Sequence, residues 1–543
     1  MSNEALHWSI DAMVKRDTTV FSYGWVFNET KSIQRLTLLQ IDQDGSVTNI
    51  NVDYGKIRDD VSSYFSQFDH ATNSGYVVYG SFSTLPSAYR LQLLCTYQDG
   101  TSECIDIPES HYIHSNSEEN KSILSKKVAF KQILVLIKRC LILLKGGNIS
   151  VLCSKIKRYR SHLPVNELKT SSDISKILTI KEREKVIFFL DHDLGGGANH
   201  YRNQLIHSKI AEGYSALVLA FDIKTLSYKL LVMSETCDAA YKIPNEQFIF
   251  DMLSVLAIKE IIYNTGVSFI NPETIPGFLL DMKLKTKAKL TTLAHDFFPI
   301  CPSHFLINDK GKYCDIPTPD VCQSCLKNNT FGFTTLFEAG DIKEWRDQWG
   351  GLIIASDKFV TFSQSTLDIY RRAYPRLQPE NTLIAPHVVG YIPKRAEVQQ
   401  KERLCIGVVG QIGFHKGAEF VKQLAYEIKK TELPADIVII GAIEASCPSG
   451  VVTQTGPYKQ SDLPDLLEDN GVNIILFPSI WPETFSYVVQ EMVELGYPIA
   501  CFNLGAPAER LKNYQKGLIL SSMSAGNVLQ ELIKFHSKIY TIQ

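Results

Sequence analysis

Two glutamates, Glu483 and Glu491, stand eight positions apart across the junction between a loop and a predicted helix. Thr484 is a candidate N-cap for that helix, which would leave the next backbone amides free to bind an anion. These amides belong to Phe485, Ser486 and Tyr487. Two carboxylates on either side of such amides suit a nucleotide-linked sugar, with hydroxyls at both ends and a diphosphate between them. The alternative is a pair of solvated glutamates, which the apolar segment between them disfavours.

A second candidate site is the glycine run Gly195-Gly196-Gly197, between the predicted strand 186–190 and a predicted helix 198–212. Glycines let the backbone approach a phosphate, and the first amides of the helix point at the anion. A dinucleotide site is the alternative, because Asp222 ends the next predicted strand. His200 disfavours it, since it stands where the third glycine of that motif is needed for close packing.

The loop from Gly410 to Gly417 follows another predicted strand, 404–409, and contains Gln411 and Lys416. A lysine between glycines can hold a diphosphate as a point charge. Taken alone, this loop is more typical of a surface turn with a solvated lysine.

Four cysteines cluster after His295-Asp296 with the spacing C-x12-C-x7-C-x2-C. Four thiolates within 25 residues predict a structural zinc site, with reduced buried cysteines or disulfides as alternatives. The candidate ligands are Cys301, Cys314, Cys322 and Cys325.

The elements that must position these residues divide the 543-residue chain into several parts, because one hydrophobic core cannot serve this length. Residues 1–112 read as a β-sandwich-like domain, with predicted strands at 18–27, 34–41, 47–52, 75–82 and 89–97. Its aromatics, such as Tyr76 and Tyr79, are expected in the core rather than on a carbohydrate-binding face. Residues 181–392 and 393–543 read as two Rossmann-like domains, with 385–402 as the linker. The first includes predicted strands at 260–263, 289–294, 351–355 and 359–362.

Residues 113–180 form a basic helical segment: eleven Lys and Arg and no acidic residue lie between 121 and 164. Such a segment, here 121–160, is expected to bind an anionic membrane surface or to be a solvated helical linker. The net charge of −2 argues against a general nucleic-acid binder. We find no signal peptide and no spanning segment, and the cysteines are mostly scattered. We therefore expect a cytoplasmic protein, with attachment to the inner face of the cytoplasmic membrane through the basic segment.

Taken together, GGGAN after a strand, His295-Asp296, Lys416-Gly417 and PETFSYVVQEMVELGYP resemble retaining glycosyltransferase family 4, over about 185–520. The segment 341–375 more loosely resembles bacterial polysaccharide or O-antigen members, in which an N-terminal β-domain is familiar. The resemblance implies a GT-B fold, in which two Rossmann-like domains face a cleft. It also implies a nucleotide-sugar donor and a glycan or lipid-linked acceptor.

The resemblance assigns roles to individual residues. Glu483 would contact the donor sugar, Glu491 the ribose, Lys416 the diphosphate, and His295 the transferred sugar and acceptor. Gly196, Gly197 and the amides at 485–487 would surround the phosphates. The leaving phosphate would accept the proton, and no catalytic metal is expected. Gln411 departs from the family, which has an arginine in this loop, so a weakly catalytic scaffold subunit of a polysaccharide assembly complex is an alternative. An NAD-dependent enzyme is a further one.

Overall fold

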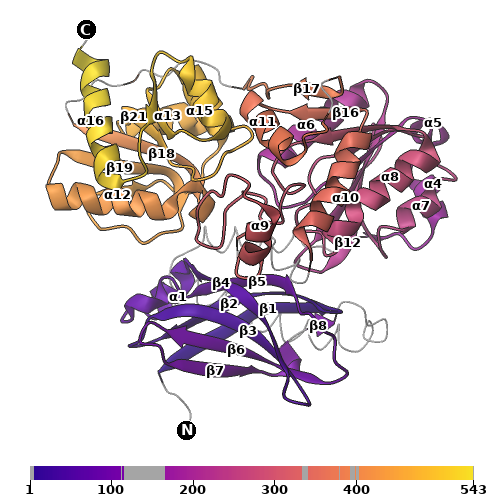
Figure 1. Ribbon diagram of the computed structural model, residues 1–543, viewed down its shortest axis with the longest axis horizontal. Helices are drawn as coiled ribbons and strands as arrows, with labels where there is room; N and C mark the ends of the chain where they lie inside the picture. The colour runs from indigo at the N-terminus through magenta and orange to yellow at the C-terminus, as the bar shows by residue number, and fades with distance from the viewer. Residues whose placement is uncertain are drawn as a thin grey trace.

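The computed structural model describes residues 5–111, 113–114, 166–329, 331–332, 340–377, 380–391, 398 and 403–541. They form the predicted β-domain and two Rossmann-like domains, which confirms the expected GT-B arrangement (Figure 1). The basic segment 121–160 lies outside the described residues, so its expected helix and membrane contact stay predictions. Among the described residues no helix is long and apolar enough to cross a membrane.

The N-terminal domain is one curved sheet with strand order β7-β6-β3-β4-β5-β2-β1-β8. All the strands predicted in this region are present, and they are joined in one continuous sheet rather than in two stacked ones. The sheet closes over a core that includes Val26, Leu38 and Leu93. The strand bounds are β1 Leu6–Arg16, β2 Thr19–Asn28, β3 Ile33–Asp42, β4 Val47–Lys56, β5 Gly75–Ser81, β6 Tyr89–Tyr97, β7 Ser102–Ile107 and β8 Ile113–His114; helix α1 is Asp59–Tyr64.

The first Rossmann-like domain has the strand order β17-β16-β15-β14-β10-β11-β12-β13-β9. Its centre is parallel, and β10 in the middle of the sheet is entirely apolar and buried, as expected for a strand that is covered on both faces. The strand bounds are β9 Asn166–Glu167, β10 Val186–Leu190, β11 Ser215–Asp222, β12 Ser227–Met233, β13 Asp238–Ile243, β14 Ile258–Tyr263, β15 Lys289–Leu293, β16 Lys358–Thr361 and β17 Thr382–Ile384.

The helices of this domain include one prediction that is wrong. Residues 351–355, expected as a strand, are the last turns of α10, which buries Trp345, Trp349 and Leu352 on one face. The helix bounds are α4 Ile174–Ile177, α5 Ile180–Arg183, α6 Gly197–Ala211, α7 Phe248–Met252, α8 Ile275–Thr286, α9 Pro319–Leu326, α10 Ile342–Ala355 and α11 Gln364–Ala373.

The second Rossmann-like domain is a parallel sheet of order β20-β19-β18-β21-β22-β23 with helices on both faces. The bounds are β18 Leu404–Ile412, α12 Ala418–Thr431, β19 Ala435–Ile443, β20 Val452–Gln454, α13 Leu463–Asp469, β21 Ile474–Phe477, α14 Tyr487–Leu495, β22 Ile499–Phe502, α15 Gly505–Lys512, β23 Gly517–Leu520 and α16 Ala525–Thr541. Glu491 and the loop before α14 therefore follow the carboxyl end of β21, where open α/β sheets bind ligands.

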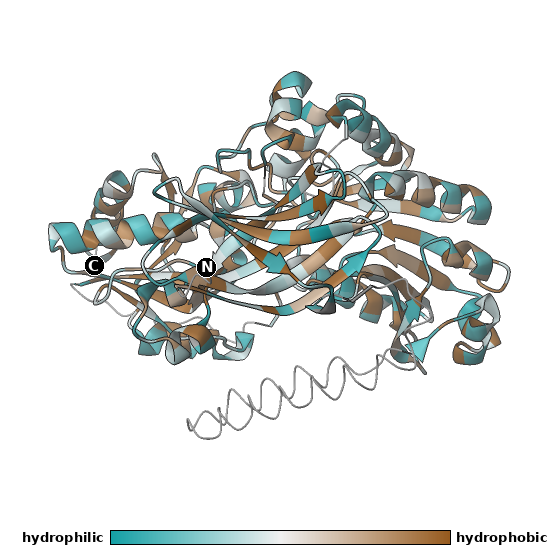
Figure 2. Cartoon of the chain, turned by 90° about the horizontal axis from the view of Figure 1, so that it is seen from below, coloured by the Kyte–Doolittle hydropathy of each residue, from teal (hydrophilic) through white to brown (hydrophobic). Residues whose placement is uncertain are grey.

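The β-domain lies beneath both Rossmann-like domains (Figure 1), and apolar and polar segments are interspersed along its strands (Figure 2). Phe21 of β2 is buried in the core of the first Rossmann-like domain beside Leu226 and Tyr228. Tyr79 donates a hydrogen bond to the carbonyl of Ser268. Tyr76 is 2 % exposed and is a core residue of the β-domain as expected, whereas Tyr79 is part-buried against the core of the first Rossmann-like domain.

Candidate active site between the Rossmann-like domains

Glu483 and Glu491 both lie buried at the contact between the two domains, although they come from different local structures. Glu483 precedes α14 and its Oε1 is buried without a hydrogen-bond partner among the described residues. Burial raises the pKa of the Glu483 carboxyl, and the nearby charge of Lys416 opposes this shift. Lys416 and Glu483, which the sequence analysis assigned to one site, therefore lie close enough for their charges to interact.

Glu491 lies one turn into α14, and its Oε1 accepts hydrogen bonds from Tyr391 and from Gln460, the latter at 3.1 Å. Burial raises the pKa of this carboxyl, while both hydrogen bonds lower it. Tyr391 and Gln460 escaped the sequence analysis, since neither stands in a motif. Both donors bond to the same carboxylate oxygen, Oε1.

The N-cap residue predicted for α14 is wrong. Ser486, rather than Thr484, is the N-cap, and its Oγ accepts a hydrogen bond from the amide of Val489 at 3.3 Å. Thr484 instead points across the domain contact, where its Oγ1 donates to the carbonyl of His295 at 2.8 Å. The amides at 485–487 remain at the start of the helix, where the first N–H groups have no partner within the helix.

Gly196 and Gly197 form the start of α6, with Gly196 at a φ of +85°. The ring of Tyr487 lies on Gly197: a Cβ built there would be 3.1 Å from the ring. The structure thus brings the glycine run of one domain onto the first helical residue of α14 in the other. His200, one turn further, meets the Tyr487 ring edge-on at 5.3 Å.

A set of buried polar side chains supports the glycine run through hydrogen bonds. Asp191 forms an ion pair with Arg202 at 2.8 Å and accepts a hydrogen bond from Asn199 at the same distance. Asn199 in turn accepts a hydrogen bond from the amide of Gly195 at 2.7 Å. The sequence analysis missed these residues, because polar residues near the start of a helix are usually exposed to solvent. Their burial becomes evident only when the packing of the helix on the sheet is known.

His295 lies half-buried between the domains, with its ring stacked on Phe362 at 4.4 Å. Burial lowers its pKa well below the usual range, so the imidazole is neutral. Its Nε2 is buried without a hydrogen-bond partner in the described part of the chain. The neighbouring Asp296 accepts hydrogen bonds from Thr265 and from the amide of Phe298.

The loop after β18 places Lys416 in a short 3-10 helix, Phe414–Lys416, and Gly417 at a φ of +86° next to the carbonyl of Pro478. Gln411, the departure from the family pattern, lies exposed at the end of β18. His415 stacks on Phe305 of the other domain at 4.2 Å. The loop is therefore a domain contact, and not a free surface turn.

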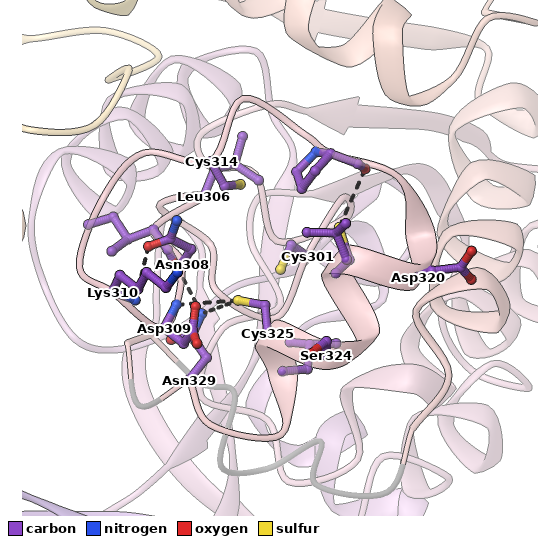
Figure 3. Close-up of a pocket in the computed structure, with 15 residues that line it drawn as sticks. Cys301, Leu306, Asn308, Asp309, Lys310, Cys314, Asp320, Ser324, Cys325 and Asn329 are labelled. Carbon is purple, nitrogen blue, oxygen red and sulfur yellow. Dashed lines mark hydrogen bonds between the residues drawn. The ribbon is translucent and has the colours of Figure 1, made fainter.

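The structure does not support the predicted zinc site. Among the residues described, no group of three or more His, Cys, Asp or Glu side chains is placed to hold a metal ion. The thiols instead line a cavity of about 560 Å³ beside α9 (Figure 3). They are engaged separately: Cys322 accepts from Arg346 at 3.3 Å, and Cys325 from the amide of Asp309 at 3.3 Å. Thiolate ligands of zinc must instead converge on one point about 2.3 Å from each sulfur.

The sequence analysis also missed His387, which follows β17 in the segment leading to the second domain. The ring lies between those of Tyr201, at 4.6 Å, and Phe485, at 4.4 Å, and its Nδ1 is 2.8 Å from the hydroxyl of Tyr487. A histidine soon after a strand, like His295 after β15, was the available signal. Its role in the domain contact required the fold.

Comparison with known proteins finds remote likenesses among solved structures. Anabaena HepE, solved with UDP and glucose, is 13 % identical over 66 % of this chain and 94 % of its own, with a TM-score of 0.43. The lipopolysaccharide outer core galactosyltransferase WaaB, in its apo form, is 11 % identical over 66 % and 94 %, with a TM-score of 0.40. A glycosyltransferase from Rickettsia africae is 11 % identical over 66 % and 92 %, with a TM-score of 0.39.

No curated protein matches the chain. A family model does match part of it: residues 393–538 match the model described as "Glycosyl transferases group 1". This match covers the second Rossmann-like domain almost completely, including Lys416, Glu483 and Glu491. That domain is therefore similar to group 1 glycosyl transferase domains.

Proposed function

We propose that this protein transfers a sugar from a nucleotide-sugar donor, with retention of configuration, to a glycan or lipid-linked acceptor in the synthesis of a cell-surface polysaccharide. The observation that carries the proposal is the pair of buried carboxylates, Glu483 and Glu491, in a group 1 glycosyl transferase domain at the contact with His295 and the glycine run. Retention and the kind of acceptor rest on the family resemblance alone.

In this proposal Glu483 binds hydroxyls of the sugar and Glu491 binds the ribose. Lys416 and the amides at the start of α14 and α6 bind the diphosphate. The bond between the anomeric carbon and the phosphate oxygen breaks, and the acceptor oxygen forms its bond on the same face of the sugar. The acceptor proton passes to the leaving phosphate oxygen, whose charge Lys416 and the amides stabilise.

A nucleotide screen tests the proposal. UDP, GDP and dTDP, their common sugar conjugates and NAD are added to the full chain, and thermal stabilisation is measured, since a ligand that binds the folded state raises its stability. We expect one class of nucleotide sugar to stabilise the protein and to be hydrolysed or transferred. Stabilisation by NAD alone, or by no nucleotide, would contradict the proposal.

Substitutions then test the two carboxylates. Glu483→Gln and Glu491→Gln are each expected to lower kcat/KM for the donor at least a hundredfold, because each removes a charge-assisted hydrogen bond to the ligand. Glu494→Gln is the matched control, because Glu494 lies exposed on the same helix. Equal activities in all three variants would overturn the assignment of the site.

A further inference from the structure

His387 stands at the centre of the domain contact. It is 8 % exposed, and its ring is stacked between Tyr201 of the first domain and Phe485 of the second. Phe362 meets it edge-on at 4.2 Å. The aromatic rings on three sides fix the orientation of the imidazole, so its two nitrogens have defined directions.

The two nitrogens differ in their surroundings. Nδ1 lies 2.8 Å from the hydroxyl of Tyr487, whereas Nε2 is buried and has no hydrogen-bond partner among the described residues. A neutral imidazole carries one N–H and one lone pair, so the Tyr487 bond uses one of them and leaves the other unmet. A buried polar atom without a partner costs free energy, and such atoms in folded proteins call for an explanation.

Two more unpartnered atoms belong to the same region. The rings of His295 and His387 are 5.5 Å apart at 71°, and the Nε2 of His295 is likewise buried without a partner in the described chain. Thr484, which directly follows Glu483, donates a hydrogen bond to the carbonyl of His295. The Oε1 of Glu483 is the third buried atom without a hydrogen-bond partner among the described residues. Three unmet polar atoms thus belong to one buried stretch of the domain contact.

We propose that His387 is a third contact to the transferred sugar, holding one of its hydroxyls through Nε2. This inference rests on the proposed function, and it adds a residue from the interdomain segment to Glu483 and His295. The rings around His387 are uncharged, which suits a hydroxyl and not a phosphate. Burial and the nearby His200 lower the pKa of His387 to about 3, so the neutral imidazole offers the same hydrogen bond throughout the physiological range.

The test separates the two nitrogens by substitution. The amide nitrogen of glutamine reaches about the position of Nε2 and that of asparagine about the position of Nδ1, so His387→Gln keeps the proposed sugar contact and His387→Asn keeps only the Tyr487 contact. The measured quantity is the ratio of the Kd of the nucleoside diphosphate to that of its sugar conjugate, by calorimetry on the full chain. The pair used is the nucleotide and nucleotide sugar that stabilise the wild type best in the UDP, GDP and dTDP panel.

We expect His387→Asn to lower this ratio about fivefold to tenfold, the effect of one lost hydrogen bond. His387→Gln should keep it within about twofold, and the Kd of the free nucleotide should be unchanged in both variants. Equal ratios in the Gln and Asn variants, or a fall in the free-nucleotide affinity alone, would overturn the sugar contact while leaving the proposed function intact. A wild type that binds no nucleotide sugar would overturn both.

Discussion

Burial controls the protonation of single residues at the domain contact. His387 has its pKa lowered to about 3, and Asp296 has its pKa raised to about 6, in both cases chiefly because the charged form loses its hydration. For His387 the folded pKa lies below the unfolded value of about 6.5, so the unfolded state binds more protons below that pH. Its contribution to stability is complete above pH 6.5 and is lost as the pH falls toward 3. Asp296 acts in the opposite direction, because its folded pKa lies above the unfolded value of about 3.9, and its contribution is lost as the pH rises from about 4 to 6.

The acid sensitivity of His387 gives a prediction at this scale. Between pH 6 and 4, His387→Gln is expected to make the fall in the free energy of unfolding shallower by about 1.4 kcal/mol per pH unit, because glutamine takes up no proton on unfolding. Urea unfolding at a series of pH values, followed by near-UV circular dichroism, measures the slope. His207→Gln, at an exposed position of α6, is the control and should keep the wild-type slope. An unchanged slope in His387→Gln would mean that His387 is protonated in the folded state.

At the scale of elements, the loop after β18 and the loop before α14 are in close contact at one glycine. Gly417 has a φ of +86°, and a Cβ built on it would be 2.1 Å from the carbonyl oxygen of Pro478. Lys416 and Glu483 therefore keep their relative position only while residue 417 has no side chain. The motif Lys416-Gly417 joins a cation to a close backbone contact.

Gly417→Ala tests this junction, and Gly450→Ala is its matched control. Gly450 has a φ of +83° with open space around it, so both alanines carry the left-handed strain of about 1–2 kcal/mol, and only the first also meets Pro478. We expect Gly417→Ala to lower the affinity for the nucleotide at least tenfold and Gly450→Ala to leave it within twofold, by calorimetry. Equal losses in both variants would show that strain alone, and not the contact, sets the loop.

At the scale of the whole molecule, the β-domain is fastened differently to the two Rossmann-like domains. Phe21 is 5 % exposed within the core of the first domain. The contact with the second domain includes a part-exposed ion pair, Lys56 with Glu444 at 3.1 Å, and such pairs contribute at most about 1 kcal/mol. The β-domain and the first Rossmann-like domain should therefore unfold as one unit, while the second domain is held to it more weakly.

Phe21→Ala is expected to break this unit. Loss of a buried phenylalanine costs about 3–5 kcal/mol, here at the junction of two domains. The calorimetric transition of the β-domain should separate from that of the first Rossmann-like domain, and limited proteolysis should cut between them. Tyr23→Ala, which changes the 40 % exposed residue two positions along β2, is the control and should keep the wild-type profile. A Phe21→Ala variant with that same profile would contradict the docking described here.

Local patterns in the sequence were enough to predict a β-domain followed by two Rossmann-like domains. Strand–glycine–helix junctions, alternating β-patterns and the spacing of Glu483 and Glu491 are short-range features, and the β-strands of the N-terminal domain appear where they were expected. Short apolar runs do not distinguish strand from helix, which is why residues 351–355 were assigned wrongly. Cysteine spacing likewise predicted a zinc site, but spacing alone does not determine the directions of the four thiol groups.

Contacts between distant segments were decided by the tertiary structure alone. Thr484 caps no helix because His295, 189 positions earlier, offers its carbonyl instead, and Tyr391 reaches Glu491 across 100 positions. His387 has no motif of its own, and its place follows from the packing of Tyr201 and Phe485 from the two domains. The physical reason is that burial and hydrogen-bond partners are properties of the packed chain. The sequence determined which groups can do chemistry, and the packing of the two domains determined which of them are buried, neutral and unpartnered.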